Sequence, residues 1–193
     1  MSIVSCGRLV SVRPAVIDSN VIWGHSLSSP RGLQDYKIMM SSLKLFYAEP
    51  SEIEIAKLCR REAKRRGEQL SNKTIMIRTK RRLADFDRLD VTPKSSHITV
   101  EIEKRLWLSC ISRSKIEEMR TDISIASVAI AELKTSTSRG LCVSHNYDLF
   151  HIECAASKDL EVWSALERKK TSPSCDDVTE SMIQNSVTLD ALI

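Results

Sequence analysis

The sequence lacks long apolar runs and closely paired cysteines. Its apolar stretches, such as Ile123 to Ala131, are broken by polar residues and are far shorter than the roughly 20 residues of a membrane-spanning helix. Six scattered cysteines with no CxxC pair argue against a zinc ribbon and against a dense disulfide framework, so we interpret them as reduced, mostly buried thiols. Aromatic residues make up only 5% of the chain and form no ladder, which disfavours an oligonucleotide-binding module built on base stacking.

Length and composition predict one globular domain with tails. The chain has 193 residues, of which 42% are hydrophobic and 28% charged, so it is not composed like a disordered protein. We expect an extension at 1–13, a domain at 14–164 and a mobile polar tail at 165–193. The segment Met1 to Val12 lacks an apolar core followed by a small-residue cleavage site, so we expect a cytoplasmic location.

The order of the expected elements predicts a three-layer α/β/α domain with a central, mainly parallel sheet. The run from Pro14 to Trp23 is typical of a buried strand, with Asp18 at its carboxyl end and a Ser-, Pro- and Gly-containing loop from Ser26 to Gly32 beyond it. The other predicted strands are Gly140–Ser144, with a turn at 145–150, and Leu160–Trp163. Predicted helices are 33–47, one opening at 50–54, 75–89, 101–112 and 121–133, with 97–102 ambiguous.

Basic residues are concentrated in one segment, although the net charge of the whole chain is only +4. Such a segment could follow the phosphates of a nucleic acid, or it could be a solvated helix face with ion pairs such as Glu62 with Arg66. Its members are Lys57, Arg60, Arg61, Lys64, Arg65, Arg66, Lys73, Arg78, Lys80, Arg81 and Arg82.

Three oxygen-bearing side chains follow predicted strands or open a predicted helix. Asp18 ends the first strand, Asp122 lies in the first turn of the helix at 121–133, and Asn146 follows the strand at 140–144. Each alone could be an ordinary turn or first-turn residue. Together at adjacent strand ends, such carboxylates and amides form a hard-oxygen site that suits Mg²⁺ or Mn²⁺, and hydrolysis of a phosphodiester would be a natural use of it.

These residues carry a resemblance to the PIN domain family. The stretch Ala15-Val-Ile-Asp-Ser-Asn-Val21 resembles the family's opening strand, and Thr121 to Ala129 is similar to its Asp-x-x-Ile-Ala-Ala-x-Ala helix. The stretch Leu141 to Phe150 is similar to the family's Leu-Val-Thr-x-Asn-x-x-x-Phe segment, and Leu160 to Trp163 resembles the closing segment of its VapC-type toxins. The order and spacing of the pieces also agree with the family.

The resemblance implies a PIN-like fold and a set of site residues. Asp18 and Asp122 would hold Mg²⁺ or Mn²⁺, with Asn146, or Asp148 in its place, completing the metal site. Asn20 would orient Asp18 by hydrogen bonding. With the second acid discussed next, the implied catalytic set is Asp18, Glu54, Asp122 and Asn146, and the implied metal ligands are Asp18, Asp122 and Asp148.

The second acid is where this sequence departs from the family pattern. One alignment of the segment after the first helix places Lys57 at the acidic position, and a buried lysine among carboxylates would compete with a cation. A different register offers Glu54, which we choose, while Glu52 and Glu62 remain alternatives. The loop from Lys134 to Arg139 is also longer than the family's usual turn.

The activity implied by the resemblance is metal-dependent hydrolysis of RNA by a VapC-like toxin of a toxin–antitoxin pair. The resemblance also implies a homodimer, and inhibition by an antitoxin protein that inserts an apolar stretch and an arginine near the acidic site. One alternative is a PIN-fold protein that has lost catalysis and only binds RNA or a protein. Another is an unrelated α/β binding domain in which the acids are helix caps and turns.

Overall fold

The computed structural model describes residues 12–26, 43–144, 146–156 and 158–164, and its centre is a five-stranded parallel sheet. The strands lie in the order β3-β2-β1-β4-β5, so β1 is central. Their bounds are β1 Arg13–Ile17, β2 Leu43–Ala48, β3 Asp87–Leu89, β4 Gly140–Ser144 and β5 Leu160–Ser164. All four pairings are parallel, with Val16 opposite Phe46 on one side and Cys142 on the other.

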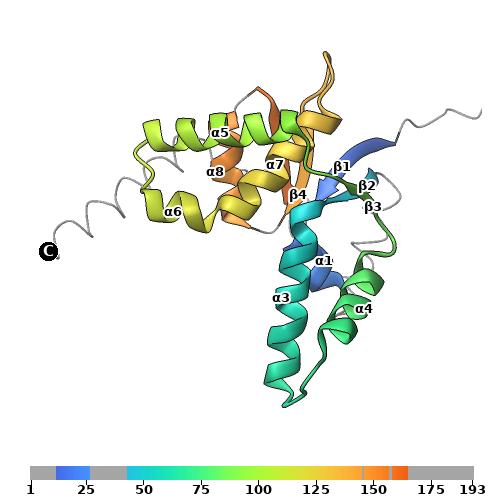
Figure 1. The fold of residues 1–193 in the computed structure, drawn as a ribbon. Helices are drawn as coiled ribbons and strands as arrows, with labels where there is room; N and C mark the ends of the chain where they lie inside the picture. The colour runs from blue at the N-terminus through green and yellow to red at the C-terminus, as the bar shows by residue number, and fades with distance from the viewer. Residues whose placement is uncertain (1–11, 27–42, 145, 157, 165–193) are drawn as a thin grey trace, which may run out of the picture.

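Helices cover both faces of this sheet (Figure 1). Their bounds are α1 Ser19–Ser26, α3 Glu49–Arg65, α4 Asn72–Leu83, α5 Pro93–Leu108, α6 Arg113–Glu118, α7 Arg120–Leu133 and α8 Tyr147–Ala156. The predicted three-layer α/β/α class with a parallel sheet is confirmed. Within the described ranges, no helix combines the length and apolar character needed to cross a membrane.

Alternation along the strands divides the core into two halves. Val16 and Cys142 face a core formed mainly by α5, α7 and α8, which includes Ile123, Val128 and Ile152. Their strand neighbours point to the opposite face, where α1, α3 and α4 contribute the other core half. Because both faces are covered, the central strands are apolar over Ala15–Ile17 and Leu141–Val143, on side chains that point to either face, as in buried parallel strands.

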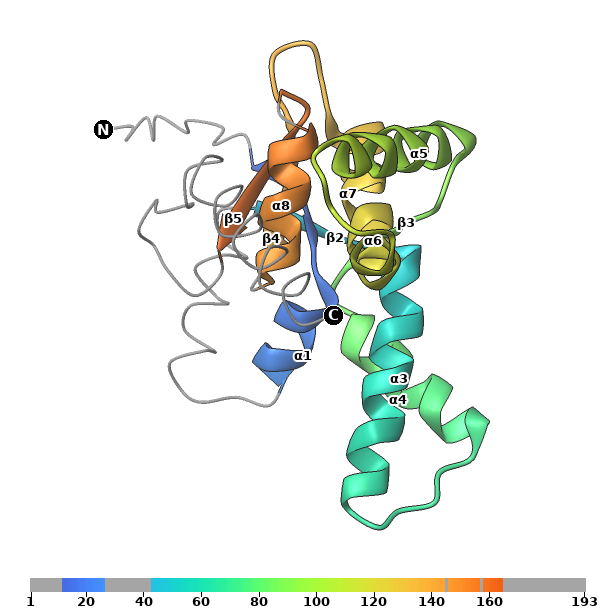
Figure 2. The same cartoon turned by 90° about the vertical axis from the view of Figure 1, so that its left-hand side faces the viewer.

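Helices α3 and α4 form a hairpin that extends away from the body of the domain (Figure 2). Pro50 near the start of α3 and the acidic residues of its first turn favour helix initiation. Gly67 follows α3 with φ of 70°, a left-handed conformation that glycine adopts without strain and that turns the chain back. Ser71 then caps α4 by accepting a hydrogen bond from the backbone N–H of Thr74 at 3.2 Å.

Two predicted elements need correction near the N-terminus. The strand ends at Ile17, and Val21 to Trp23 belong to α1, because a helix starts immediately after Asp18. The predicted helix at 33–47 is wrong over Leu43–Tyr47, which lies in β2. There Leu43, Leu45 and Tyr47 are buried while Lys44 is exposed, which is the two-residue burial period of a strand. The helix-like spacing of apolar residues over the whole stretch 33–47 concealed this period. Residues 33–42 lie outside the described residues.

Three further differences concern shorter segments. The predicted helix at 75–89 ends at Leu83 because its last residues, Asp87–Leu89, pair with β2 as an edge strand. The ambiguous 97–102 is helical within α5, and the predicted turn at 145–150 gives way to α8 at Tyr147. Cys59 and Cys142 are free and buried, and Cys110 is free but exposed, which agrees with reduced and mostly buried thiols. Cys154 is disulfide-bonded, so the prediction of a reduced thiol is wrong there. The predicted tail, the loop at 27–32 and most of the extension lie outside the described residues.

Candidate active site

Asp18 lies at the carboxyl end of β1 and is fully buried. Its backbone N–H donates to the carbonyl of Val143 at 2.9 Å, which extends the β1–β4 pairing to the site. The Ser144 hydroxyl donates to Oδ2 of Asp18 at 2.7 Å. The amide of Asn20 lies 3.4 Å from the same oxygen, in the position expected for orienting this carboxylate. The Asp18 carboxylate is therefore fixed by groups from both β4 and α1.

Glu54 is the candidate second acid that the fold places beside Asp18. The Ser19 hydroxyl donates to the Glu54 carboxylate and also lies 3.2 Å from Oδ1 of Asp18, so this serine bridges the two acids. Lys57, one helical turn further along α3, is exposed, so it is not buried among these carboxylates. The two alternative acids have other partners. Glu52 accepts hydrogen bonds from Tyr47 and Arg88, and Glu62 forms ion pairs with Arg66 and Arg82.

Asp122 and Asn146 form the second part of the site. Asp122 lies in the first turn of α7 with 7% of its surface exposed, and Asn146 follows β4. Nδ2 of Asn146 donates to Oδ2 of Asp122 at 3.0 Å. The backbone N–H of Asn146 donates to Oγ of Ser144 at 2.8 Å. Asn146 and Ser144 thus connect Asp122 to Asp18.

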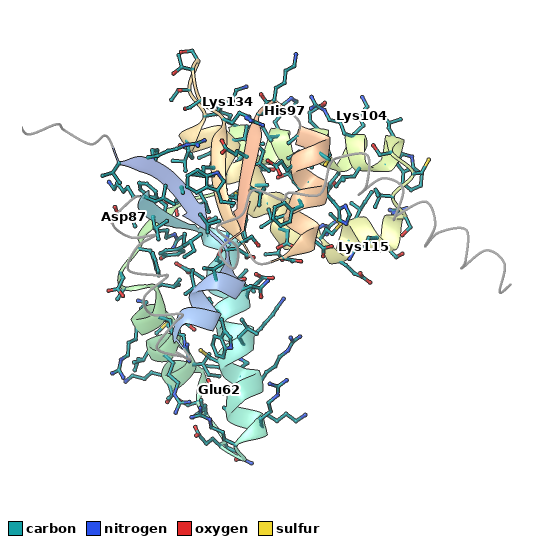
Figure 3. All side chains as sticks on the ribbon, turned by 180° about the vertical axis from the view of Figure 1, so that it is seen from behind. Glu62, Asp87, His97, Lys104, Lys115 and Lys134 are labelled. Atoms are coloured by element: carbon teal, nitrogen blue, oxygen red, sulfur yellow. The ribbon has the colours of Figure 1, made fainter. Side chains whose placement is uncertain are left out.

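Asp148 lies at the edge of the site and is paired with a lysine. Its backbone N–H donates to Oδ1 of Asn146 at 3.1 Å, so the Asn146 side chain caps the start of α8. Its carboxylate lies 3.1 Å from Nζ of Lys115, which comes from α6 (labelled in Figure 3). The structure therefore brings all five predicted site residues together, with Asp148 neutralised by a partner.

Burial and mutual repulsion dominate the electrostatics of these acids. Burial raises the pKa of Asp18 above its usual value, against the hydrogen bonds of Ser144 and Ser19, which lower it. Burial likewise raises the pKa of Glu54. The pKa of Asp122 is raised to about 8, first by burial and then by the charges of Asp18, Glu54 and Asp148, while Lys115 lowers it. The pKa of Asp122 is therefore influenced by three acidic side chains, which raise it, and by one lysine, which lowers it.

The donor set fits a hard divalent cation. Carboxylate, amide and hydroxyl oxygens are the ligands that Mg²⁺ and Mn²⁺ prefer, and a positive charge here would relieve the repulsion that raises the pKa of Asp122. Asp18, Glu54 and Asp122 are the residues that would hold the ion. Within the described residues, no group of three acidic, histidine or cysteine side chains is already arranged to bind a metal ion. The three carboxylates would therefore have to move closer together around an ion.

Sequence reasoning missed three residues of this site. Ser144 and Ser19 lie within the motifs that were recognised, and their positions next to strand ends were a usable signal. Lys115 lies 33 residues before Asp148 on a short helix of its own, and no local pattern indicated that it would reach the acids.

The comparisons with known proteins bear on the fold. No protein-family model matches the chain, and no curated protein matches it. A chain in the crystal structure of VapBC2 from Rickettsia felis bound to a DNA fragment from their promoter matches with a TM-score of 0.54 at 13% identity, covering 78% of this chain and 98% of that chain. A chain in the structure of FitAB bound to an IR36 DNA fragment matches with a TM-score of 0.53 at 15% identity, covering 81% and 99%. The protein therefore has the PIN-like fold of these neighbours.

Proposed function

We propose that this protein is a metal-dependent endoribonuclease that hydrolyses RNA phosphodiester bonds. The observation that carries the proposal is the convergence of Asp18, Glu54 and Asp122 at the carboxyl ends of β1 and β4, where each carboxyl group has a raised pKa. Open α/β sheets hold their ligands at this edge, next to the central strand where the strand order reverses. An acidic cluster there would repel a phosphodiester unless a cation were bound.

Each side chain has a task in this proposal. Asp18, Glu54 and Asp122 would hold Mg²⁺ or Mn²⁺, which supplies the positive charge that activates water and stabilises the charge developing on the leaving oxygen. Ser144 and Ser19 fix the Asp18 carboxylate, and Asn146 fixes Asp122. Asp122 holds a proton near neutral pH because its pKa is about 8, so cation binding would release that proton.

We further propose that the protein is a VapC-like toxin held inactive by an antitoxin, and that it acts as a homodimer. The two structural neighbours are named as members of VapBC2 and FitAB assemblies bound to DNA, which supports a partner protein. A groove of about 730 Å³ between α3 and α4 offers a docking place, since it is lined by Ile53 and Met76, whose exposed fractions are 61% and 53%. An apolar stretch of the antitoxin would cover these side chains.

The test is cleavage of a panel of structured RNAs by the wild type, Asp18→Asn and the exposed control Asp85→Asn, each with Mn²⁺ or with EDTA. The expected result is Mn²⁺-dependent cutting by the wild type and the control that is lost in Asp18→Asn. Thermal unfolding is recorded in parallel, because an ion present at 100 times its Kd stabilises the fold by about 2.7 kcal/mol. No cutting and no metal-induced stabilisation would refute the proposal and favour an α/β domain of unrelated function.

A second candidate is a PIN-fold protein that binds RNA or a protein without cutting. The ion pair between Lys115 and Asp148 favours it, since a lysine ammonium already occupies the edge of the acidic cluster. Stabilisation by Mn²⁺ with no cutting of any RNA would identify this case.

A further inference from the structure

The basic residues of the α3–α4 hairpin separate into two groups when their partners are considered. Three have acidic partners within the hairpin, namely Arg66 and Arg82 with Glu62, and Arg78 with Glu68. The other basic residues of the hairpin are exposed and form no ion pair with a described residue: Lys57, Arg60, Arg61, Lys64 and Arg65 on α3, and Lys73, Lys80 and Arg81 on α4. Four of these, Lys57, Arg61, Lys64 and Arg65, share one side of α3, and we call them the α3 basic stripe.

The stripe lies on the same side of α3 as the candidate second acid. Counted from Glu54, its members follow at 3, 7, 10 and 11 residues, and at 100° per residue all four fall within about 80° of the direction of Glu54. Lys57 is close enough for its charge to lower the pKa of Glu54. A 1.5 Å rise per residue carries the stripe about 16 Å from the acid to Arg65. The stripe therefore begins at the acidic site and leads away from it.

The helix that carries the stripe is held firmly in place. Its opposite side buries Ile55, Cys59 and Ala63, the first two of them in the core half shared with α4. Arg82 of α4 ties the two helices together through Glu62 of α3, and it also stacks over Trp23 of α1 with 4.0 Å between the guanidinium carbon and the ring centroid. Figure 3 shows side chains with nitrogen at their ends projecting outward along α3. The unpaired charges are thus presented on a fixed support.

We infer that the α3 basic stripe binds the sugar-phosphate backbone of single-stranded RNA and leads it to the acidic site, an inference that rests on the proposed nuclease function. Neighbouring cations one helical turn apart are spaced by about 5–6 Å, which suits successive phosphates of one extended strand. The stripe carries no aromatic side chain, so binding depends on phosphates and not on base stacking. Recognition along α3 is therefore independent of base sequence and sensitive to salt.

The test uses binding without cleavage, so that it stays separate from the nuclease question. In EDTA and on an Asp122→Asn background, the affinity for a fluorescent 12-nucleotide oligouridine is measured from 50 to 200 mM salt. The stripe variant carries Arg61→Gln, Lys64→Gln and Arg65→Gln. The matched control carries Lys104→Gln, Arg113→Gln and Lys158→Gln, three exposed residues outside the hairpin, so both variants lose three positive charges.

The expected result is a loss of affinity of roughly tenfold in the stripe variant, with the slope of log affinity against log salt reduced in magnitude by about 2, while the control stays near its parent. Circular dichroism confirms that both variants are folded. An equal loss in both variants would show a general effect of net charge and overturn the inference. If poly-glutamate displaced the oligouridine as effectively as unlabelled RNA of equal charge, the stripe would be assigned to an acidic protein partner. That result would also overturn the inference. RNA binding that needs the stripe in a protein that cuts no RNA would leave this inference standing while the nuclease proposal fails.

Discussion

The Ser144 hydroxyl links Asp18 to the segment that follows β4. It donates to Oδ2 of Asp18 at 2.7 Å and accepts from the backbone N–H of Asn146 at 2.8 Å, and it is fully buried. One buried side chain thus holds both Asp18 and Asn146, two residues of the candidate site.

Replacement of Ser144 should therefore affect both neighbours. Ser144→Ala removes one donor to the buried Asp18 carboxylate and the acceptor of the Asn146 backbone N–H, and we expect a loss of about 1–3 kcal/mol in the free energy of unfolding. Urea denaturation measures the loss, with the exposed Ser109→Ala as a control that should change stability by less than about 0.5 kcal/mol. A Ser144→Ala protein as stable as the wild type would contradict the bridging role.

The raised pKa of Asp122 predicts how stability depends on pH. Between the ordinary value of 3.8 and about 8 this group is protonated in the folded protein and ionised in the unfolded chain, so stability falls as pH rises through this window. In EDTA we expect Asp122→Asn to stabilise the protein at pH 8 by about 2 kcal/mol or more, and to have little effect near pH 4. Thermal unfolding at several pH values tests this, and an equal fall in the variant would disprove it. Asp85→Asn, on an exposed residue, should follow the wild type.

Gly140 is required by a close approach between β4 and α7. A Cβ at this position would lie 2.5 Å from the carbonyl oxygen of Ala129 and 2.7 Å from its carbonyl carbon, both backbone atoms. We expect Gly140→Ala to destabilise the fold by about 2–3 kcal/mol, because α7 and with it Asp122 must shift. The matched control is Gly24→Ala, where an added Cβ meets nothing within 4 Å and the helix gains up to about 1 kcal/mol. Equal melting temperatures for the two variants would show that the contact relaxes at no cost.

Lys115 should compete with a divalent cation. Removing its charge with Lys115→Gln raises the pKa of Asp122 further, since this lysine lowers it, and frees Asp148. We expect Mn²⁺ affinity, measured by calorimetry at pH 8, to increase several-fold, with a stability cost below about 1 kcal/mol because the pair is partly exposed. Lys134→Gln breaks a similar pair with Asp159 away from the site and is the control. Weaker Mn²⁺ binding in Lys115→Gln would mean that the lysine orders the site instead.

Local pattern was sufficient for the parts of the site that follow regular strands and helices. Asp18, Asp122 and Asn146 each stand next to an apolar run whose length and periodicity are clear, so their positions at strand ends and in a helix turn followed from sequence. β2 was missed because its six residues are part of a longer stretch with helix-like spacing. Its pairing with β1 is a tertiary contact that no local pattern indicates. Propensity alone does not decide such short segments.

The choice among Glu52, Glu54 and Glu62 could not be settled from the sequence. All three lie on α3, and the selection depends on which side of that helix faces Asp18. Contact with α1 through Ser19 places Glu54 beside Asp18, while Glu52 bonds to Tyr47 and Glu62 pairs with Arg82. The position of Lys115 likewise depends on the packing of α6 beside α7, and no spacing rule describes it.

The hydrogen bond between Ser144 and Asp18 joins residues 126 positions apart in the chain. The acidic cluster therefore does not exist until β4 has paired with β1, which requires nearly the whole folded domain to be present. A nascent chain would therefore carry an incomplete site until β4 has emerged from the ribosome and paired with β1. If the protein cuts RNA, a nascent chain thus gains that activity only after this pairing has formed.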